Sequence, residues 1–431
     1  MMPIIRLAGS LAFEAFYRRR HLGDELPSRG PAILVANHPN GLVDPLAMML
    51  STSGSVRFLA KAPLFRMPVL GWVMKGMGAL PVFRSIDGAN TSDNEQTFSA
   101  VFDALERGEL ISLFPEGISH SEPTLQTLKT GAARMALGAE ARAEERLGVT
   151  IVPVGLHYGR KKRFRSRMSV WAGEPIEVHD LLEHHESDER AAARQLTDRI
   201  AEGLRKVSVQ LEDWEDLPLI EMAERISPDD GRTKHDRTLA YADGIRLLRE
   251  RDPEAAEDLQ NRVSDFRDRL EFLKLAPEDL DLRYTLGGVF RFVVRTGFQL
   301  CVTLPLAALG TAVWLIPYEA TRRGSRLHRV EPDIVATQKL LLGIVLFLFW
   351  WITVASLVGR ELGVEWGLAT ALLMPLLGSL TLRWGDRFRA VRRDVASFLR
   401  FTSAGDLKAE LREQRDELVA TIGERRAELI D

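Results

Sequence analysis

The segment NHPNGLVDP places His38 and Asp44 six positions apart in a polar stretch rich in turn-forming residues. In such a pair the carboxylate can hold one nitrogen of the imidazole ring, which fixes the tautomer and leaves the other nitrogen free to take a proton from a hydroxyl. The pair therefore predicts general-base chemistry on an alcohol. A structural interpretation also fits, in which Asp44 caps a helix and His38 completes a turn.

The residues around this pair predict how it is presented. PAILVA, directly before it, has the composition of a buried strand, and Gly41 in the following turn can adopt a positive φ. Asp44 and Pro45 then suit the start of a helix that continues through LAMML. His38 is thus expected on a loop at the end of a strand, where open α/β sheets present catalytic groups.

Three later apolar runs also end in residues that could bind a ligand. Arg84 follows GALPVF, and its guanidinium suits phosphate oxygens. Glu116 and Gly117 follow LFP, where a glycine lets backbone N–H groups approach a phosphate. Pro153 lies in the apolar run IVPVGL, beside which a hydrophobic ligand could lie. Taken singly, each also has a purely structural explanation. Arg84 could form a surface ion pair, Glu116 could interact with a helix dipole, and Pro153 could belong to an edge strand.

Length and composition set the broad class. A chain of 431 residues is too long for one compact core and predicts two or three units. A net charge of −3 and a pI near 6.4 argue against a nucleic-acid-binding protein. The single cysteine, Cys301, excludes a disulfide framework or a cysteine zinc site within one chain.

Composition also divides the chain into segments. Residues 25–185 alternate short apolar runs with helix-like segments, which predicts an α/β domain, and residues 186–290 predict charged, solvated helices. Residues 1–24 place three arginines after an apolar stretch, which indicates an interfacial amphipathic helix or an ordinary surface helix. Residues 396–431 predict a charged C-terminal helix with no role beyond a partner contact.

The membrane segments are predicted within residues 291–395. Three stretches there contain no charged side chain: 296–318, 340–359 and 366–382. Because a helix needs about 20 apolar residues to cross hydrocarbon, the second and third stretches predict a spanning hairpin. Pro305 and basic residues on both sides of the first stretch favour a re-entrant or interfacial segment, with a full crossing as the alternative. Lys and Arg cluster at both ends of the hairpin, so both ends are predicted to face the cytoplasm.

The order and spacing of His38 to Asp44, GALPVFRS, FPEG and VPVGL resemble the four blocks of the glycerolipid acyltransferase family, which has a PlsC-type domain. NHPNGLVDP, FPEGISHSEPTLQTLKTGAARMALGA and HYGRKKRFRSRMSVWAGEPI are similar to the fungal-type glycerol-3-phosphate and dihydroxyacetone-phosphate acyltransferases. Two departures stand out. Five residues rather than four separate the histidine from the aspartate, and Ile118 and Ser119 replace the usual Thr-Arg after FPEG. An arginine expected to help hold phosphate is therefore absent from that block.

The resemblance implies an α/β domain whose mixed sheet is flanked by helices, followed by the charged helical region and the transmembrane hairpin. It implies transfer of a fatty acyl group from a thioester to a hydroxyl of glycerol 3-phosphate or dihydroxyacetone phosphate. His38 would act as general base and Asp44 would orient it. The implied substrate-binding residues are Arg84, Glu116, Gly117 and Pro153. The thioester of coenzyme A or of acyl carrier protein is the implied co-substrate, with no metal and no further cofactor.

The basic run RKKRFRSR places six cations within eight residues, 160–167. It could bind anionic lipid headgroups, at about 1 kcal/mol per cation, or supply the phosphate contact missing after FPEG. Phe164 among the cations suits an interfacial position. The candidate phosphate or membrane contacts are Lys161, Lys162, Arg163, Arg165 and Arg167. His120 and Lys129 are further candidates, although a solvated turn explains either.

Three alternative functions compete with this interpretation. Within the same family, the acceptor could be 1-acylglycerol 3-phosphate, which gives phosphatidate. A lipid hydrolase is disfavoured because the sequence has no Gly-x-Ser-x-Gly elbow. A catalytically inactive lipid-binding module would be expected to have lost His38 or Asp44, and both are present. The expected location is a membrane, with the catalytic domain on its cytoplasmic face.

Overall fold

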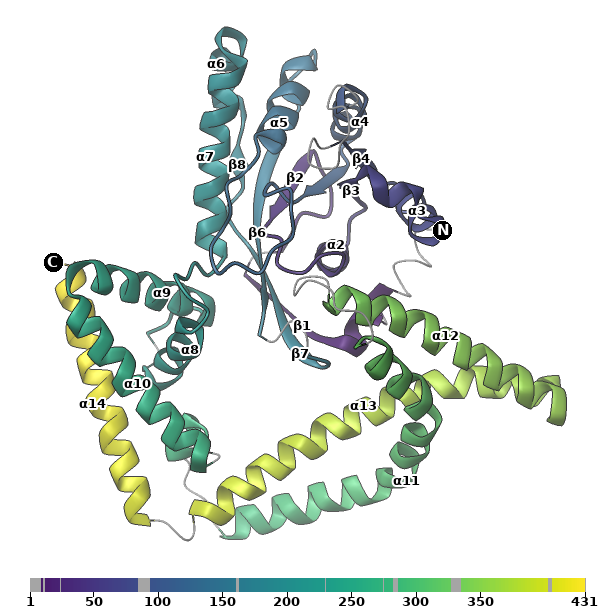
Figure 1. Cartoon of the computed structure of the whole chain (residues 1–431), viewed down its shortest axis with the longest axis vertical. Helices are drawn as coiled ribbons and strands as arrows, with labels where there is room; N and C mark the ends of the chain where they lie inside the picture. The colour runs from purple at the N-terminus through teal and green to yellow at the C-terminus, as the bar shows by residue number, and fades with distance from the viewer. Residues whose placement is uncertain are drawn as a thin grey trace. The chain divides into compact units, whose positions relative to one another are not determined.

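The computed structural model describes residues 9–10, 12–23, 25–83, 94–159, 163–228, 230–273, 275–281, 286–326, 335–401 and 405–430. The chain forms two compact units (Figure 1). The first comprises Met1–Val209 and Gly324–Ile344, and the second comprises Gln210–Arg323 and Val345–Asp431.

The described part of the first unit is built on one eight-stranded sheet. Its strands are β1 (Tyr17–Gly23), β2 (Ala32–Ala36), β3 (Val56–Lys61), β4 (Leu80–Val82), β5 (Leu110–Leu113), β6 (Thr150–Tyr158), β7 (Ser166–Ala172) and β8 (Ile176–Glu177). They lie in the order β1-β7-β6-β2-β5-β3-β4, and β8 pairs with β6. β7 and β8 run antiparallel to β6, whereas the other pairs are parallel. The sheet is therefore mixed, as the family resemblance implied.

Helices cover both faces of this sheet (Figure 1). They are α2 (Val43–Ser51), η1 (Ala62–Arg66), α3 (Pro68–Gly76), α4 (Asn94–Glu106), α5 (Gly131–Arg142), η4 (His179–Leu181), α6 (Leu182–Ser187) and α7 (Glu189–Val207). Side chains alternate along β2, so Leu34 packs into a core shared with α2, whereas Ile33 and Val35 pack into a core shared with α5 and α7. Burial on both faces explains why β2 reads as a continuous apolar run.

The N-terminal prediction was wrong in part. Residues 9–10 and 12–16 are helical, but residues 17–23 form β1, which pairs with β7 at the edge of the sheet. Phe13 and Tyr17 are almost fully buried, and Phe16 is 8% exposed. The protein's own core therefore covers the two described phenylalanines, Phe13 and Phe16, of the stretch that had suggested contact with lipid.

The boundary predicted at residue 185 lies too early. α7 belongs to the first unit, because Leu196, Ile200 and Leu204 are buried against the sheet. The charged outer face of this helix hid its apolar stripe, since a surface helix needs only about one third of its residues to be apolar.

The second unit contains the helices of the charged region. These are α8 (Asp216–Ile226), α9 (Lys234–Arg251), α10 (Pro253–Leu273), η5 (Pro277–Asp281) and α14 (Gly405–Ile430). Phe266 and Leu270 of α10 share a core with Leu411 and Leu418 of α14. The charged C-terminal helix thus has a packing role that its poor heptad pattern did not indicate.

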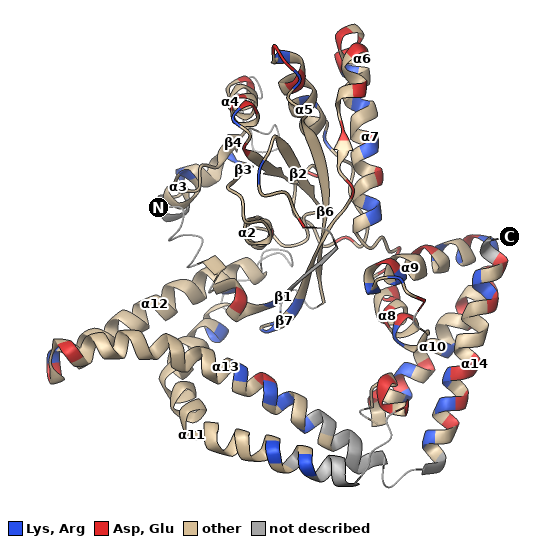
Figure 2. Cartoon of the chain, turned by 180° about the vertical axis from the view of Figure 1, so that it is seen from behind, with Lys and Arg blue, Asp and Glu red and all other residues tan. Residues whose placement is uncertain are grey.

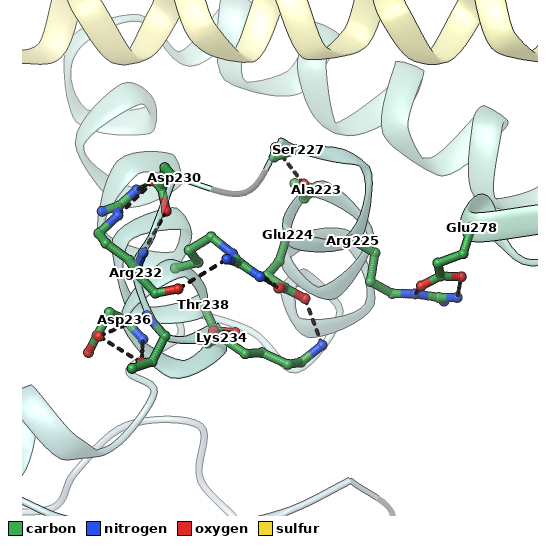
Figure 3. A network of polar contacts seen from close by, with 12 residues as sticks. Ala223, Glu224, Arg225, Ser227, Asp230, Arg232, Lys234, Asp236, Thr238 and Glu278 are labelled. Carbon is green, nitrogen blue, oxygen red and sulfur yellow. Dashed lines mark hydrogen bonds and ion pairs between the residues drawn. The ribbon is translucent and has the colours of Figure 1, made fainter. Parts of the chain in front are cut away.

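A network of ion pairs joins α8 to α9 (Figure 3). The buried carboxylate of Glu224 accepts hydrogen bonds from Lys234 at 2.6 Å and from Arg237 at 2.8 Å. Arg225 forms a bidentate pair with Glu278 of η5. Glu224 needs these partners because an uncompensated charge in the interior is strongly destabilising.

Within the part of the chain that the structure describes, three helices are long and apolar enough to cross a membrane: α11 (Leu286–Gly324), α12 (Val335–Leu362) and α13 (Val364–Phe401). The two runs predicted as a hairpin lie in α12 and α13. Between these helices Gly363 has a φ of +106°, and Gly367 packs so closely on the backbone of Gly359 that a side chain at position 367 would clash. α11 continues as one helix through Pro305 and Pro317, so the predicted re-entrant segment contains no unwound loop.

Candidate active site

His38 and Asp44 form the pair that the sequence predicts. His38 follows β2, and Asp44 lies in the first turn of α2. Nδ1 of His38 is 2.9 Å from Oδ2 of Asp44. The carboxylate is fully buried, whereas 17% of the imidazole side chain is exposed. Because Nδ1 faces the carboxylate, Nε2 is the nitrogen that a substrate hydroxyl can use.

Two further donors hold the Asp44 carboxylate. The backbone N–H of Asn40 donates to Oδ2 at 2.7 Å, and the hydroxyl of Tyr158 donates to Oδ1 at 2.6 Å. Burial, together with the nearby Asp44 charge, raises the pKa of Tyr158 well above its ordinary value. Tyr158 therefore stays protonated and remains a donor, so both oxygens of Asp44 are fixed before a substrate binds.

A second tyrosine supports the loop. Asn40, which is fully buried, donates from Nδ2 to the hydroxyl of Tyr17 at 3.0 Å. The rings of Tyr17 and Tyr158 pack edge to face, 5.3 Å apart. Sequence reasoning missed these three residues. The one available indication was a polar aromatic residue at the end of a predicted strand, in VGLHY.

Glu116 lies directly behind the His38 loop. Its side chain is buried, and Oε1 accepts the backbone N–H of His38 at 2.9 Å. Oε2 accepts the backbone N–H of Gln126 at 2.8 Å and lies 2.5 Å from Nε2 of His120. Both oxygens are thus occupied by the protein itself, which makes Glu116 a positioning residue. That Glu116 also contacts the acceptor stays a prediction.

The rest of this segment also contacts His38. The ring of Phe114 stacks on the imidazole, with 4.0 Å between centroids and 12° between planes. The backbone N–H of His120 donates to the carbonyl of His38 at 3.1 Å. Gly117 has a φ of +75°, and its N–H donates to the carbonyl of Phe114 at 3.0 Å, so the glycine closes a tight turn. FPEG and the His38 loop therefore form one hydrogen-bonded assembly.

Pro153 lies elsewhere. It is buried in β6 and pairs with Val35 of β2, so the two side chains point to the same face of the sheet, the face covered by α7. A side chain added at Gly203 of α7 would meet the proline ring. The structure therefore places Pro153 in the core under α7, and its predicted contact with the acyl group stays a prediction. Arg84, Lys161 and Lys162 lie outside the described residues.

The described part of the basic run has two roles. Arg163 and Arg167 are exposed, and Arg167 is the register neighbour of Arg18 on β1, so two basic segments meet at the edge of the sheet. Arg165 turns inward instead. Its Nη1 donates to the carbonyl of Glu14 at 2.6 Å, and its backbone N–H donates to that of Phe16 at 2.6 Å.

The start of α12 is part of the catalytic unit. Ala336 and Leu340 are buried in the same core as the α2 side chains Val43 and Met48. The backbone N–H of Leu42, two residues before Asp44, donates to Oγ1 of Thr337 at 3.1 Å. α12, the first helix of the hairpin, is thus hydrogen-bonded to the loop that carries His38 and Asp44.

The comparisons with known proteins agree with this geometry. Residues 18–157, which include His38, Asp44 and Glu116, match the family model described as Acyltransferase. The chain is 28% identical over 283 residues to Glycerol-3-phosphate O-acyltransferase 1 of Saccharomyces cerevisiae and 29% identical over 293 residues to Glycerol-3-phosphate O-acyltransferase 2. These alignments cover 60% and 62% of this chain but only 37% and 39% of the yeast proteins, so the chain spans less than two fifths of their length.

Two more distant similarities complete the comparison. The chain is 30% identical over 155 residues to 1-acyl-sn-glycerol-3-phosphate acyltransferase LPAT1, chloroplastic, of Arabidopsis thaliana, which covers 36% of this chain and 40% of that protein. Among solved structures, the 1-acyl-sn-glycerophosphate acyltransferase PlsC of Thermotoga maritima aligns over 47% of this chain and 79% of its own, at 19% identity and a TM-score of 0.35. The fold described above does not depend on that alignment.

Proposed function

We propose, on the premise that residues 18–157 form an acyltransferase domain, that the chain moves a fatty acyl group from a thioester to a hydroxyl of glycerol 3-phosphate or dihydroxyacetone phosphate. The observation that carries the proposal is a partly exposed imidazole, 17% accessible, whose Nδ1 is fixed by a fully buried carboxylate 2.9 Å away. The similarity to the two yeast glycerol-3-phosphate O-acyltransferases supports this choice of acceptor.

In the proposed reaction, Nε2 of His38 takes the proton of the acceptor hydroxyl as the oxygen attacks the thioester carbonyl. The tetrahedral intermediate then collapses and expels the thiolate. The imidazolium gives its proton to this thiolate, which leaves as the thiol. Asp44 stabilises the imidazolium, as the aspartate of a Ser-His-Asp triad does. The acyl group passes directly to the acceptor, so the step needs no covalent enzyme intermediate, metal or further cofactor.

The proposed reaction needs cationic residues that bind the acceptor's phosphate and a carrier that delivers the acyl group as a thioester. Arg84 and the exposed cations Arg163 and Arg167 are the candidates for the phosphate and for anionic lipid headgroups. Coenzyme A and acyl carrier protein are the candidate carriers. The excess of Lys and Arg at both ends of the hairpin supports a cytoplasmic orientation of the catalytic unit.

A second acceptor is supported by one specific observation, the 30% identity to a 1-acyl-sn-glycerol-3-phosphate acyltransferase. Transfer to that lysolipid would use the same pair and would produce phosphatidate. A catalytically inactive lipid-binding module is the alternative from another class.

The test is transfer of a labelled acyl group by the purified chain in detergent, from coenzyme A and acyl carrier protein thioesters, to each acceptor separately. Removing a general base typically costs 10²- to 10⁴-fold in rate, so we expect about that loss in His38→Ala. His184→Ala, at an exposed histidine of α6, is the matched control and should keep full activity. Absence of transfer to every acceptor by well-folded protein would favour the lipid-binding module.

A further inference from the structure

The segment Lys61–Met77 contains η1 and α3, and two large apolar residues among its described side chains are open to solvent. Trp72 is 61% exposed and Met67 is 51% exposed. The segment is nevertheless firmly packed, because Met74 and Met77 are buried in the core of the first unit. The exposed tryptophan is therefore held outward by an anchored helix. Two bulky apolar side chains held in water by one anchored segment suit a surface that contacts an apolar phase.

The charges around these side chains have one sign. Lys61, Arg66 and Lys75 are exposed, and residues 61–77 contain no Asp or Glu. Figure 2 shows this basic character on α3. Tryptophan with flanking lysine and arginine is the composition found at membrane–water interfaces, where the indole lies at the level of the headgroups and the cations meet lipid phosphates.

We propose that the segment Lys61–Met77 docks on the surface of an anionic bilayer. Trp72 and Met67 insert among the headgroups, and the three cations contact lipid phosphates. A bilayer is favoured over an acidic protein partner because the same chain carries helices of membrane-crossing length. The inference does not depend on acyl transfer, since it concerns only the contact of this segment with lipid.

The test uses the full chain reconstituted in bilayer nanodiscs, with Cys301 replaced by alanine. A nitroxide label is attached to Met67→Cys, which keeps Trp72, and to Glu186→Cys on the exposed surface of α6 as the matched control. We expect the label at 67 to be several-fold less accessible to a water-soluble nickel chelate, and more accessible to oxygen, when the bilayer contains anionic lipid. The label at 186 should stay accessible to the chelate in every bilayer. Equal accessibility of both labels to the chelate would overturn the proposal.

Charge reversal tests the electrostatic part. Lys61→Glu, Arg66→Glu and Lys75→Glu together should abolish the dependence on anionic lipid at position 67. As the matched control, the triple charge reversal of Arg194, Arg205 and Lys206, which are exposed on α7, should leave the dependence of the label at position 67 on anionic lipid unchanged. Shielding of the label that survives the first triple reversal would show that the contact is not with anionic lipid. Shielding that occurs only on addition of acyl carrier protein would assign the surface to an acidic protein instead, and either result overturns the proposal.

Discussion

At the scale of single residues, the hydroxyl of Tyr158 is the contact that most directly tunes the His38–Asp44 pair. Tyr158→Phe removes a donor from a buried charged acceptor, a bond worth about 1.5–3 kcal/mol, so kcat/KM should fall about 10- to 100-fold. The fall is measured in a steady-state acyl-transfer assay.

Tyr17→Phe is the matched control, because the hydroxyl of Tyr17 accepts a hydrogen bond from Asn40, whereas that of Tyr158 donates to the Asp44 carboxylate. It should lower stability and leave kcat/KM nearly unchanged. An unchanged kcat/KM in Tyr158→Phe would show that this hydroxyl has only a packing role.

Glu116 can be assigned to the loop or to the acceptor by kinetics. Glu116→Gln keeps the size of the side chain but replaces one acceptor oxygen by an NH₂ donor. This donor would face the backbone N–H of Gln126, which now donates to Oε2. If the carboxylate holds the His38 loop, kcat and the melting temperature should both fall, with KM for the phosphorylated acceptor nearly unchanged. A raised KM with an unaltered kcat would support the acceptor contact instead.

The sequence specified the His38–Asp44 pair because both residues belong to one loop, whose turn and helix start are local features. It did not specify Tyr158, which contacts Asp44 across 114 positions through the pairing of β2 with β6. For Pro153, the sequence predicted the strand correctly but did not specify the face of the sheet to which the side chain points. That face depends on register, which is set only by the assembled sheet.

At the scale of elements, the bond between Leu42 and Thr337 couples α12 to the catalytic loop. Thr337→Val keeps the shape of the side chain and leaves the partly buried N–H of Leu42 without its acceptor, at a cost of about 1 kcal/mol. We expect a lower melting temperature and a lower kcat in an acyl-transfer assay. Thr337→Ser keeps the oxygen and should retain most activity; an equal loss in both variants would point to packing rather than to the hydrogen bond.

The packing of α14 on α10 gives a second prediction at this scale. Leu418 is 1% exposed, so Leu418→Ala should destabilise the second unit by about 2–5 kcal/mol. Limited proteolysis would show faster cleavage of α14, whereas Glu424→Ala, on its exposed surface, should not change the rate. The sequence could not reveal this contact, because α14 and α10 are separated by the whole membrane segment.

At the scale of the whole molecule, side-chain contacts restrict how many times the chain crosses the bilayer. Arg412 of α14 donates to the carbonyl of Leu280 at 2.8 Å, and Arg269 of α10 donates to Gln414 at 2.8 Å. The segments directly before α11 and after α13 therefore lie on one side of the membrane. Three complete crossings between them would place them on opposite sides, so an even number is required.

The same contacts predict which helix does not cross completely. Ala336 and Leu340, at the start of α12, are buried in the catalytic unit. That unit is followed in the chain by α8, α9 and α10, whose composition is too polar for a crossing. We therefore expect α11 to begin and end on the same side, as one helix bent at Pro305 and Pro317, and α12 and α13 to cross as a hairpin.

This topology predicts the sidedness of single cysteines in sealed vesicles, in a Cys301→Ala background with a membrane-impermeant maleimide. Cysteines at the exposed positions Glu254, Arg326 and Glu424, which lie before α11, after α11 and in α14, should all react from the same side. A cysteine at Glu361, at the tip of the hairpin, should react only from the other side, because the charged reagent cannot pass the hydrocarbon. If position 326 reacted together with 361, α11 would be a full crossing, and the contacts of Ala336 and Leu340 with the catalytic core could not exist in the membrane-bound chain.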